Sequence, residues 1–421
     1  MSTRIPNTRN QSTRDQALRD QGPRNPSTRD RSGRTPSGRT PGAPPDGGPA
    51  GHGTPSGGAP AGGSPAGSTA PAGAPDAGRR GATASSHLSG PAYVLGEKEL
   101  DHTVVEDLVE RAREFGMPPQ AALWGWGTVR RTAETLQSLA VRAGLTTLRT
   151  SGTDPSDVDC LVLCSTRFPG GPRTHGRFVQ EVLDGLGLEN AAFTGVTLNR
   201  CTNLLAGLRL AQALVTSGQH RKVLVVTTDR VTDESRRLEK FALFSDGAAS
   251  ALVSAEPLGP DAYEIVAGAS AQDRSELEWT NEVSPVLSRT VNERILHAAE
   301  MKIGDIDAVL HLNLFKPLVV LKERQAGFTK DQLWLDNIPR FGHCFAADPL
   351  INLVDRAQNG QVKDGGSYLL AASVPGVRIG LLLRRRPAAT APGLQEHHTQ
   401  GTAGPTAPRP ATQADETGES R

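Results

Sequence analysis

The middle of the chain alternates segments of helical periodicity with short apolar runs. Apolar residues recur at helical spacing in six segments, which we predict to be helices: 104–115, 132–143, 174–186, 202–217, 288–299 and 350–358. Nearly uninterrupted apolar runs predict strands at 160–164, 223–227, 249–253, 308–312, 368–372 and 379–383. Such runs suit strands that are covered on both faces, so the alternation predicts an α/β fold.

The pattern occurs twice along the chain. DVDCLVLCSTRF (157–168) resembles DIDAVLHLNLF (305–315), and the segment from Arg200 through KVLVVTTD resembles the segment from His343 through SYLLAAS. Self-similarity of this kind predicts two pseudo-repeated halves packed together. In this scheme the helix start at Cys201 has a twin at His343 and Cys344. The junction of the halves is where we expect a site.

Both ends of the chain differ from this body. Residues 1–88 are mostly Arg, Pro, Gly, Ser and Thr, and residues 387–421 are rich in Pro, Thr and Ala. Such segments bury too little apolar surface to offset their chain entropy, so we predict that both are disordered. An over-extended reading frame is an alternative origin for residues 1–88. The body then divides into halves at 89–255 and 256–386.

The composition of the chain limits which classes of binding partner we expect. With 46 Lys and Arg against 45 Asp and Glu, the net charge is close to zero and indicates neither a nucleic-acid nor a membrane partner. The sequence has no apolar run long enough for a transmembrane helix, and no apolar signal-peptide core follows Met1. We therefore expect a cytoplasmic protein. The four cysteines lack metal-binding spacing. We read them as free thiols and expect no metal or cofactor.

Cys201 is the first candidate for chemistry. It stands between a strand-like run (193–198) and the predicted helix 202–217. Backbone N–H groups at a helix start are unpaired and the helix dipole is positive there, which favours the nucleophilic thiolate. A buried, inert cysteine is the alternative interpretation.

Seven segments follow Cys201 or precede it in a fixed order: WGWGTVRR (124–131), VDCLVLCST (158–166), KVLVVTTDR (222–230), LFSDGAASALV (243–253), HLN (311–313), FGHCFAADP (341–349) and VPGVRIG (374–380). Their order and spacing resemble those of the thiolase superfamily, and more narrowly of the ketoacyl-ACP synthase III condensing enzymes and their acyltransferase relatives. The resemblance covers about residues 90–386. This resemblance implies a five-layered αβαβα thiolase-like fold and a homodimer.

The resemblance also implies roles for individual residues. Cys201 would accept the acyl group, and His311 aligns with the catalytic histidine of the family. His343 falls where synthases III usually carry Asn. The N–H groups of Cys201 and Gly376 would form the oxyanion hole, which stabilises the tetrahedral intermediate.

Three basic residues follow His311 in the sequence, namely Lys316, Lys322 and Arg324. Relatives use such residues to dock an acidic acyl carrier protein, and steering of this kind is physically sensible. An ordinary solvated helix face is the alternative.

The implied function is that of a ketoacyl-ACP synthase III-like acyltransferase. It would load an acyl group from acyl-CoA or acyl-ACP onto Cys201 and condense it with a malonyl-type thioester, in fatty acid, lipid or polyketide-type biosynthesis. The first alternative is transfer to a hydroxyl or amine of a natural product, with a histidine as base. The second is an inactive partner subunit of another ketosynthase. Departures from the family at Thr202, Asn203 and Pro375 keep both alternatives open.

Overall fold

Nine strands of the part that the computed structural model describes, residues 85–278 and 284–387, pair into one mixed sheet. The strand order is β11-β12-β13-β10-β1-β9-β6-β4-β5. The first half of the sheet holds β1 (His87–Leu95), β4 (Cys160–Cys164), β5 (Ala192–Val196), β6 (Lys222–Asp229) and β9 (Gly247–Ser254). The second half holds β10 (Ala262–Gln272), β11 (Ala308–His311), β12 (Ser367–Val374) and β13 (Val377–Arg385).

The two halves of the sheet have the same topology. In each half a parallel pair (β4 with β6, β11 with β12) is followed by an antiparallel neighbour (β9, β13) and then by the first strand of that half (β1, β10). Strand β5, which pairs with β4, has only a single parallel bridge, Val309 to Leu333, as its counterpart. The prediction of two pseudo-repeated halves is confirmed.

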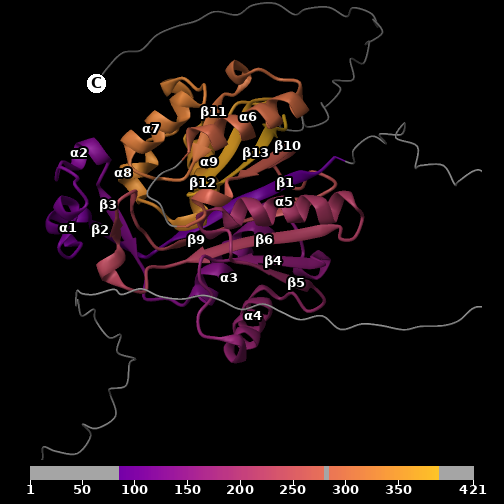
Figure 1. Cartoon of the computed structure of the whole chain (residues 1–421). Coiled ribbons are helices and arrows are strands. Elements are labelled where there is room, and N and C mark those ends of the chain that lie inside the picture. Colours follow the sequence, from indigo (N-terminus) through magenta and orange to yellow (C-terminus); the bar gives the residue numbers. More distant parts are fainter. Residues whose placement is uncertain (1–84, 279–283, 388–421) are drawn as a thin grey trace, which may run out of the picture. The chain divides into compact units, whose positions relative to one another are not determined.

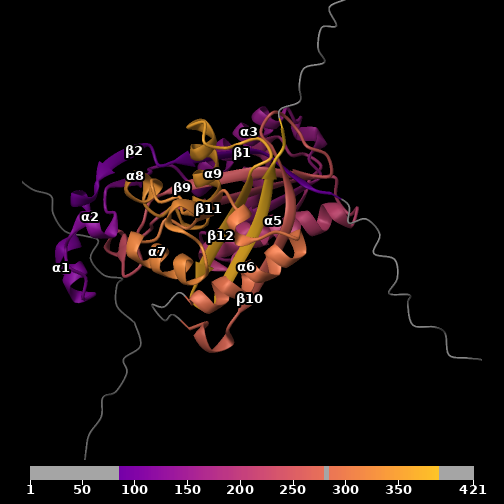
Figure 2. The same cartoon turned by 90° about the horizontal axis from the view of Figure 1, so that it is seen from above.

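Helices divide the fold into layers (Figures 1 and 2). Helix α5 (Asn203–Thr216) contacts β4, β6 and β9 of the first half and also β12 and β13 of the second, and α9 (Asp348–Gln358) likewise touches both halves. Helices α3 (Leu136–Ser151) and α4 (Pro172–Leu186) cover the outer face of the first half, and α6 (Pro285–Ala299) and α7 (Lys316–Gln325) lie outside the second. The expected five-layered αβαβα arrangement is confirmed.

The central layer requires close packing between α5 and the strands. Strands β4 and β6 are buried along nearly their whole length because helices cover both faces. A Cβ added to Gly207 of α5 would lie 2.6 Å from the Cys164 sulfur. Glycine therefore permits this helix to approach β4 and brings the start of α5 to the ends of the strands.

Smaller elements complete the structure. Strands β2 (Lys98–Asp101) and β3 (Thr128–Arg131) pair with each other. Helices α1 (Leu108–Glu114) and α2 (Ala121–Trp124) lie beside them at one side of the molecule (Figure 2). Trp126 packs there against Phe315, with ring centroids 6.2 Å apart. The remaining short elements are β7 (Leu238–Glu239), β8 (Ala242–Leu243), α8 (Asn337–Phe341), η1 (His102–Val104), η2 (Pro155–Asp157), η3 (Arg200–Thr202), η4 (Glu234–Arg236), η5 (Arg274–Glu276), η6 (Ile303–Asp305), η7 (Lys330–Gln332) and η8 (Phe345–Ala347).

The ends of the chain fall mostly outside the described residues. Of the predicted disordered extension 1–88, residues 1–84 lie outside the description, whereas His87 and Leu88 belong to β1 and are buried. The extension therefore ends earlier than predicted, because β1 pairs with both β9 and β10 at these residues. The predicted tail 387–421 lies outside the description from residue 388 onward. No helix of the described ranges is long and apolar enough to cross a membrane.

The two halves share one unusual turn. Arg200 in η3 and Phe345 in η8 both have φ of 53°, in the left-handed region that non-glycine residues seldom adopt. Each turn leads directly into a central helix, α5 or α9. Aligning these turns makes Ala346 the counterpart of Cys201. The predicted twin at His343 and Cys344 is therefore displaced by two residues from the true counterpart. The prediction matched Cys201 to Cys344 because both are cysteines, although the backbone turn lies two residues later.

Candidate active site

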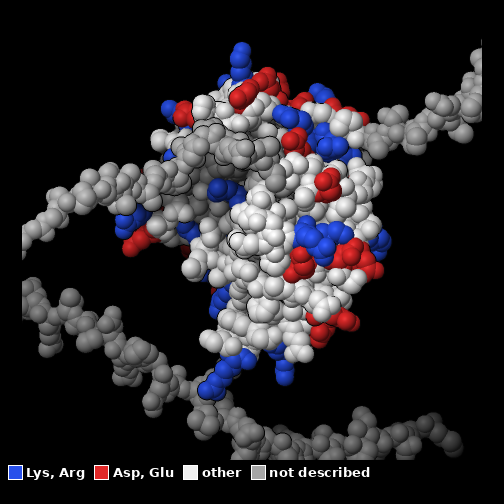
Figure 3. Space-filling view, turned by 90° about the vertical axis from the view of Figure 1, so that its right-hand side faces the viewer, with Lys and Arg blue, Asp and Glu red and all other residues white. Residues whose placement is uncertain are grey.

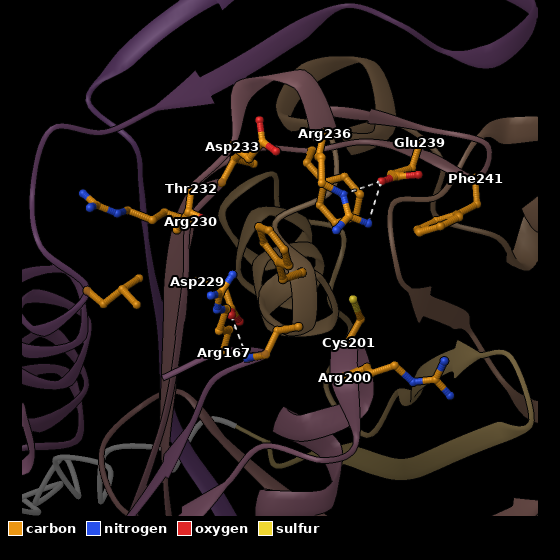
Figure 4. A pocket seen from close by; sticks show the side chains of 15 residues that line it. Arg167, Arg200, Cys201, Asp229, Arg230, Thr232, Asp233, Arg236, Glu239 and Phe241 are labelled. Carbon is orange, nitrogen blue, oxygen red and sulfur yellow. Dashed lines mark hydrogen bonds and ion pairs between the residues drawn. The ribbon is translucent and has the colours of Figure 1, made fainter. Parts of the chain in front are cut away.

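Cys201 lies in η3, immediately before α5, and opens onto a cavity of about 410 Å³ (Figure 4). Its side chain is only 7% exposed. Apolar side chains make up much of the cavity wall, and they are Leu136, Val231, Phe241, Phe244 and Phe345. The polar and charged residues of the wall are Thr166, Arg167, Arg200, Asp229, Arg230, Thr232, Asp233, Arg236 and Glu239. The cysteine is thus enclosed yet reachable from the cavity, as a nucleophile requires.

Asn203 fixes the turn that presents Cys201. Its side-chain oxygen accepts a hydrogen bond from the Asn199 N–H (3.0 Å), and its amide nitrogen donates to the Ser165 carbonyl (3.0 Å). Asn203 is fully buried and does not line the cavity. This departure from the family pattern therefore supports the turn at Arg200 rather than reshaping the cavity.

His343 is the histidine that interacts with Cys201. Its Nδ1 hydrogen-bonds the Asp348 carboxylate at 2.5 Å, and its Nε2 has no partner among the described residues other than the sulfur. Burial alone would lower the pKa of His343, but Asp348 and Cys201 outweigh that effect and raise the pKa to about 10. The ring is therefore an imidazolium at neutral pH, with a proton available at Nε2.

Asp348 holds this histidine in place and was not found in the sequence. Its Oδ2 accepts the Asn313 backbone N–H at 2.7 Å as well as the histidine proton, and its Oδ1 accepts the Cys344 N–H at 2.8 Å. The residue is fully buried at the start of α9. Its only signal in the sequence was its place five residues after His343, which equally suggests a helix-capping role.

His311 is held in the opposite state. Its Nδ1 lies 2.7 Å from the Leu312 carbonyl, so this nitrogen carries the proton and donates it. Burial lowers the pKa of His311 to about 4, and the hydrogen bond to Leu312 and the charge of Glu323 oppose this shift only in part. The ring is neutral, and its buried Nε2 has a lone pair without a partner among the described residues. His311 can accept a proton at Nε2 but has none to donate there.

A buried ionic cluster lies behind His311. Lys322 donates to Glu323 (2.9 Å) and Ser373 (3.2 Å), and Arg378 donates to both Glu323 oxygens (2.8 and 3.2 Å). Lys322 is only 6% exposed, and Glu323 and Arg378 are fully buried. The predicted docking role of Lys322 is therefore wrong, because its ammonium group is buried and paired with Glu323 inside the protein. Lys316 is half-buried and Arg324 is exposed, so docking by these two stays a prediction.

Gly376 occupies the tight hairpin between β12 and β13, with φ of 71°. A Cβ at this position would lie 2.8 Å from the Asp273 carbonyl, so only glycine fits. The hairpin reaches the turn that carries Cys201, because Arg200 donates a hydrogen bond to the Pro375 carbonyl at 2.6 Å. A role of the Gly376 N–H in an oxyanion hole, together with the N–H of Cys201, stays a prediction.

Asp229 is a second carboxyl group that the sequence did not single out. It ends β6, is 4% exposed and lines the same cavity as Cys201. Its Oδ1 accepts hydrogen bonds from the Thr166 N–H (2.7 Å) and the Ser165 hydroxyl (3.1 Å), whereas Oδ2 is buried without a hydrogen bond. Burial raises the pKa of Asp229 to about 7, although these hydrogen bonds oppose the shift.

The other cysteines contribute no second thiol to the cavity. Cys160, Cys164 and Cys344 are free and buried. Burial raises the pKa of Cys344 well above its usual value, which disfavours the thiolate. Among the described residues, no group of three His, Cys, Asp or Glu side chains is arranged to hold a metal ion.

Comparisons with known proteins agree with this arrangement. The family model of 3-oxoacyl-[acyl-carrier-protein] synthase III matches residues 197–271, the segment that contains Cys201. The beta-ketoacyl-[acyl-carrier-protein] synthase III of Campylobacter concisus is 25% identical over 281 residues, which span 57% of this chain and 80% of that protein.

Two solved structures share the fold at low identity. The acyltransferase ChlB3 superposes with a TM-score of 0.61 at 18% identity, covering 72% of this chain and 99% of ChlB3. The 3-oxoacyl-[acyl-carrier-protein] synthase III of Aquifex aeolicus gives a TM-score of 0.59 at 19% identity, covering 71% and 99%. The chain therefore shares the thiolase-like fold of these proteins. Its sequence is similar to the beta-ketoacyl-[acyl-carrier-protein] synthase III enzymes.

Proposed function

We propose that this protein takes an acyl group from a thioester onto Cys201 and passes it to a hydroxyl or amine, with His343 as the proton-transfer group. The observation that carries the proposal is the line of contacts from Cys201 through His343 to Asp348. A cysteine, a histidine and a carboxylate that orients the histidine form the arrangement that nucleophilic acyl transfer needs.

The same histidine serves both half-reactions. In loading, the Cys201 thiolate attacks the thioester carbonyl carbon, the bond to the carrier sulfur breaks, and the departing thiolate takes the proton from His343 Nε2. His343 is then neutral. In transfer, the acceptor attacks the acyl carbon and gives its proton to His343, and Cys201 leaves as a thiolate beside the restored imidazolium.

The state of His311 favours transfer to oxygen or nitrogen over condensation. Decarboxylation of a malonyl-type thioester forms an enolate that two N–H donors would stabilise. His343 offers one such donor, but His311 has no proton on Nε2 because Nδ1 donates to Leu312. Condensation remains the second candidate because relatives bear the name synthase III.

The surroundings of the cavity fit a CoA or carrier-protein thioester. Four arginines line it, against the acidic residues Asp229, Asp233 and Glu239. Arg236 is paired with Glu239, and Arg230 bonds the Glu134 carbonyl. An excess of guanidinium groups suits the phosphates of CoA or of a carrier protein's prosthetic group. Lys316 and Arg324 are the basic residues we propose for contact with a carrier protein.

We further propose a homodimer located in the cytoplasm. Strand β5 forms an edge of the sheet and is exposed along most of its length, including Phe193, which is 55% exposed. Exposed strand edges are usually covered by a partner. The four free thiols suit a reducing compartment.

The test follows the acyl group by intact mass. The protein is incubated with acyl-CoA donors of different chain types, and we expect a mass gain that is absent in Cys201→Ala and unchanged in Cys160→Ala, a buried cysteine that does not line the cavity. The loaded protein is then given malonyl-ACP or small alcohols and amines. Release of carbon dioxide would favour condensation over our proposal. Absence of an adduct with every donor would leave the inactive partner subunit as the better interpretation.

A further inference from the structure

Asp229 is the one acidic side chain of the cavity wall that is nearly fully buried. It is 4% exposed, whereas Asp233 is exposed and Glu239 is half-buried and paired with Arg236. Figure 4 shows Asp229 and Cys201 among the side chains that line the cavity. Two different elements supply them, the end of β6 and the start of α5.

The two carboxyl oxygens of Asp229 have different surroundings. Oδ1 is held by the Thr166 N–H and the Ser165 hydroxyl, which fix the orientation of the group. Oδ2 is buried without any hydrogen bond among the described residues. A buried polar atom left unpaired is costly, and such atoms in native structures usually meet water or a ligand. Asp229 lines the cavity and has one carboxyl oxygen without a hydrogen bond, so it can accept a hydrogen bond from a ligand bound there.

The rest of the wall restricts what that ligand is. Leu136, Phe244 and Phe345 are apolar residues of the same cavity wall. Arginines also line the cavity, whereas Asp229 accepts its hydrogen bonds from Thr166 and Ser165. A mostly apolar substrate with one hydrogen-bond donor matches this distribution, whereas a purely hydrocarbon chain would leave Oδ2 unpaired.

We propose that Asp229 is a specificity-determining residue that binds a hydroxyl or amine of the substrate in the Cys201 cavity. The inference rests on the proposed function, because it assigns the cavity to the acyl group and its acceptor. The donor group belongs either to the acyl chain or to the acceptor, and the two sources are separated by testing each half-reaction.

The acyl arm measures loading of Cys201 by intact mass with matched thioesters: benzoyl-CoA against its three monohydroxy isomers, and butyryl-CoA against 3-hydroxybutyryl-CoA. The acceptor arm measures loss of the acyl group to ethanol against ethylene glycol, and to ethylamine against ethanolamine. We expect a preference of about tenfold or more for the hydroxylated or aminated partner in one arm. We expect Asp229→Asn to remove most of that preference, measured as the ratio of the two rates within each pair.

The matched control is Asp159→Asn, which changes a carboxylate at the opposite end of β6, where it accepts the Arg221 and Lys222 N–H groups. Equal rates within every pair, or a preference that survives Asp229→Asn, would overturn the assignment. If Asp229→Asn fails to fold, the infrared carboxyl band of the unmutated protein serves instead. That band should shift with the hydroxylated ligands and not with their parents.

Binding to Cys201→Ala separates this inference from the proposed function. Titration calorimetry with the same thioester pairs requires no acyl transfer, so it reports on Asp229 even if no adduct ever forms on Cys201. Tighter binding of a hydroxylated ligand by about tenfold, lost in the double variant with Asp229→Asn, supports the subsite. Equal or absent binding of all pairs, together with no preference in the acceptor arm, rejects it.

Discussion

His311 and His343 are the same amino acid held in opposite states by their neighbours. His343 faces the Asp348 carboxylate and the Cys201 sulfur, whereas His311 donates to a backbone carbonyl and has Lys322, Glu323 and Arg378 nearby. One ring is therefore charged and the other neutral at the same pH. His343 can therefore donate a proton beside Cys201, whereas His311 has only a lone pair at Nε2.

Replacing Asp348 with Asn should slow acyl loading about 100-fold or more. The change removes the charge that keeps His343 protonated, and an amide retains only one of the two oxygens that hold the turn. Loading is followed by intact mass with acyl-CoA, and circular dichroism checks the fold. Asp355→Asn on the same helix is the control, because Asp355 pairs with Arg340 instead of a histidine. Equal rates in the two variants would contradict the role of Asp348.

The Asp229 carboxyl should make stability depend on pH. Its pKa is raised from 3.8 to about 7, so between those values the folded protein binds a proton that the unfolded chain releases. The free energy of unfolding therefore falls as pH rises through this window. Asp229→Asn should remove this loss, which is at most on the order of 4 kcal/mol. Measured against the unmutated protein at the same pH, the variant should therefore gain stability between pH 5 and pH 8.

Urea unfolding at the two pH values measures this effect, with the exposed Asp331→Asn as control. A difference between the unmutated protein and Asp229→Asn that is the same at pH 5 and pH 8 would show that the carboxyl does not titrate as described.

At the scale of elements, α7 docks onto the second half of the sheet through charges instead of apolar contact alone. Lys322 and Glu323 project from α7 and meet Arg378 of β13 and Ser373 of β12 without exposure to solvent. A buried charge is tolerated only while its partner remains. This interface is therefore sensitive to the loss of one side chain.

Glu323→Gln should destabilise the protein by about 3–5 kcal/mol, because it leaves two buried cations without their anion. The midpoint of urea unfolding at neutral pH measures the loss. The exposed Glu293→Gln on α6 is the matched control and should change stability by less than about 0.5 kcal/mol. A similar effect of both changes would mean that the cluster contributes little.

The sequence predicted the elements that contain continuous apolar runs or a clear helical stripe, such as β4, β6 and α5. It missed β10, because residues 267–271 of this strand are Ala, Gly and Ser and carry little apolar volume of their own. It also missed β1, where Gly90 and Pro91 interrupt the run and the register with β9 shifts between Ser89 and Ala92. In both strands pairing with neighbours, rather than local pattern, decides the structure.

The candidate site was predictable only in part for a similar reason. Cys201 could be found because a helix start is visible in the local sequence. Asp229 and Asp348 could not, since their importance comes from atoms on other elements, namely Ser165 and Thr166 for one and His343 for the other. The tautomer of His311 depends on the direction of one carbonyl group, which no sequence pattern records.

At the scale of the whole molecule, the free edge of the sheet is the feature most in need of a partner. Figure 3 shows uncharged surface between clusters of charged side chains on the side of the molecule that lies to the right in Figure 1. Phe193 on β5 is 55% exposed and Leu198 just beyond it is 93% exposed. A second copy of the chain would cover this edge beside the segment that carries Cys201.

Phe193→Lys should convert the proposed dimer to a monomer, because it places a charge on the exposed apolar edge strand β5. Light scattering coupled to size-exclusion chromatography measures the mass. Leu145→Lys, on the outer helix α3 where Leu145 is 41% exposed, should leave the dimer intact. A monomeric unmutated protein, or a dimer that persists in Phe193→Lys, would argue against this interface.

The strained turns at Arg200 and Phe345 share a shape but have separate tasks. One displays a sulfur, while the other places an aromatic side chain in the cavity wall next to the imidazolium. Cys201 belongs to the first half of the fold and His343 to the second, so the two side chains meet only when the halves pack in the observed register. Any sliding between the halves would separate the Cys201 sulfur from His343, which we propose as its proton-transfer group, without unfolding either half.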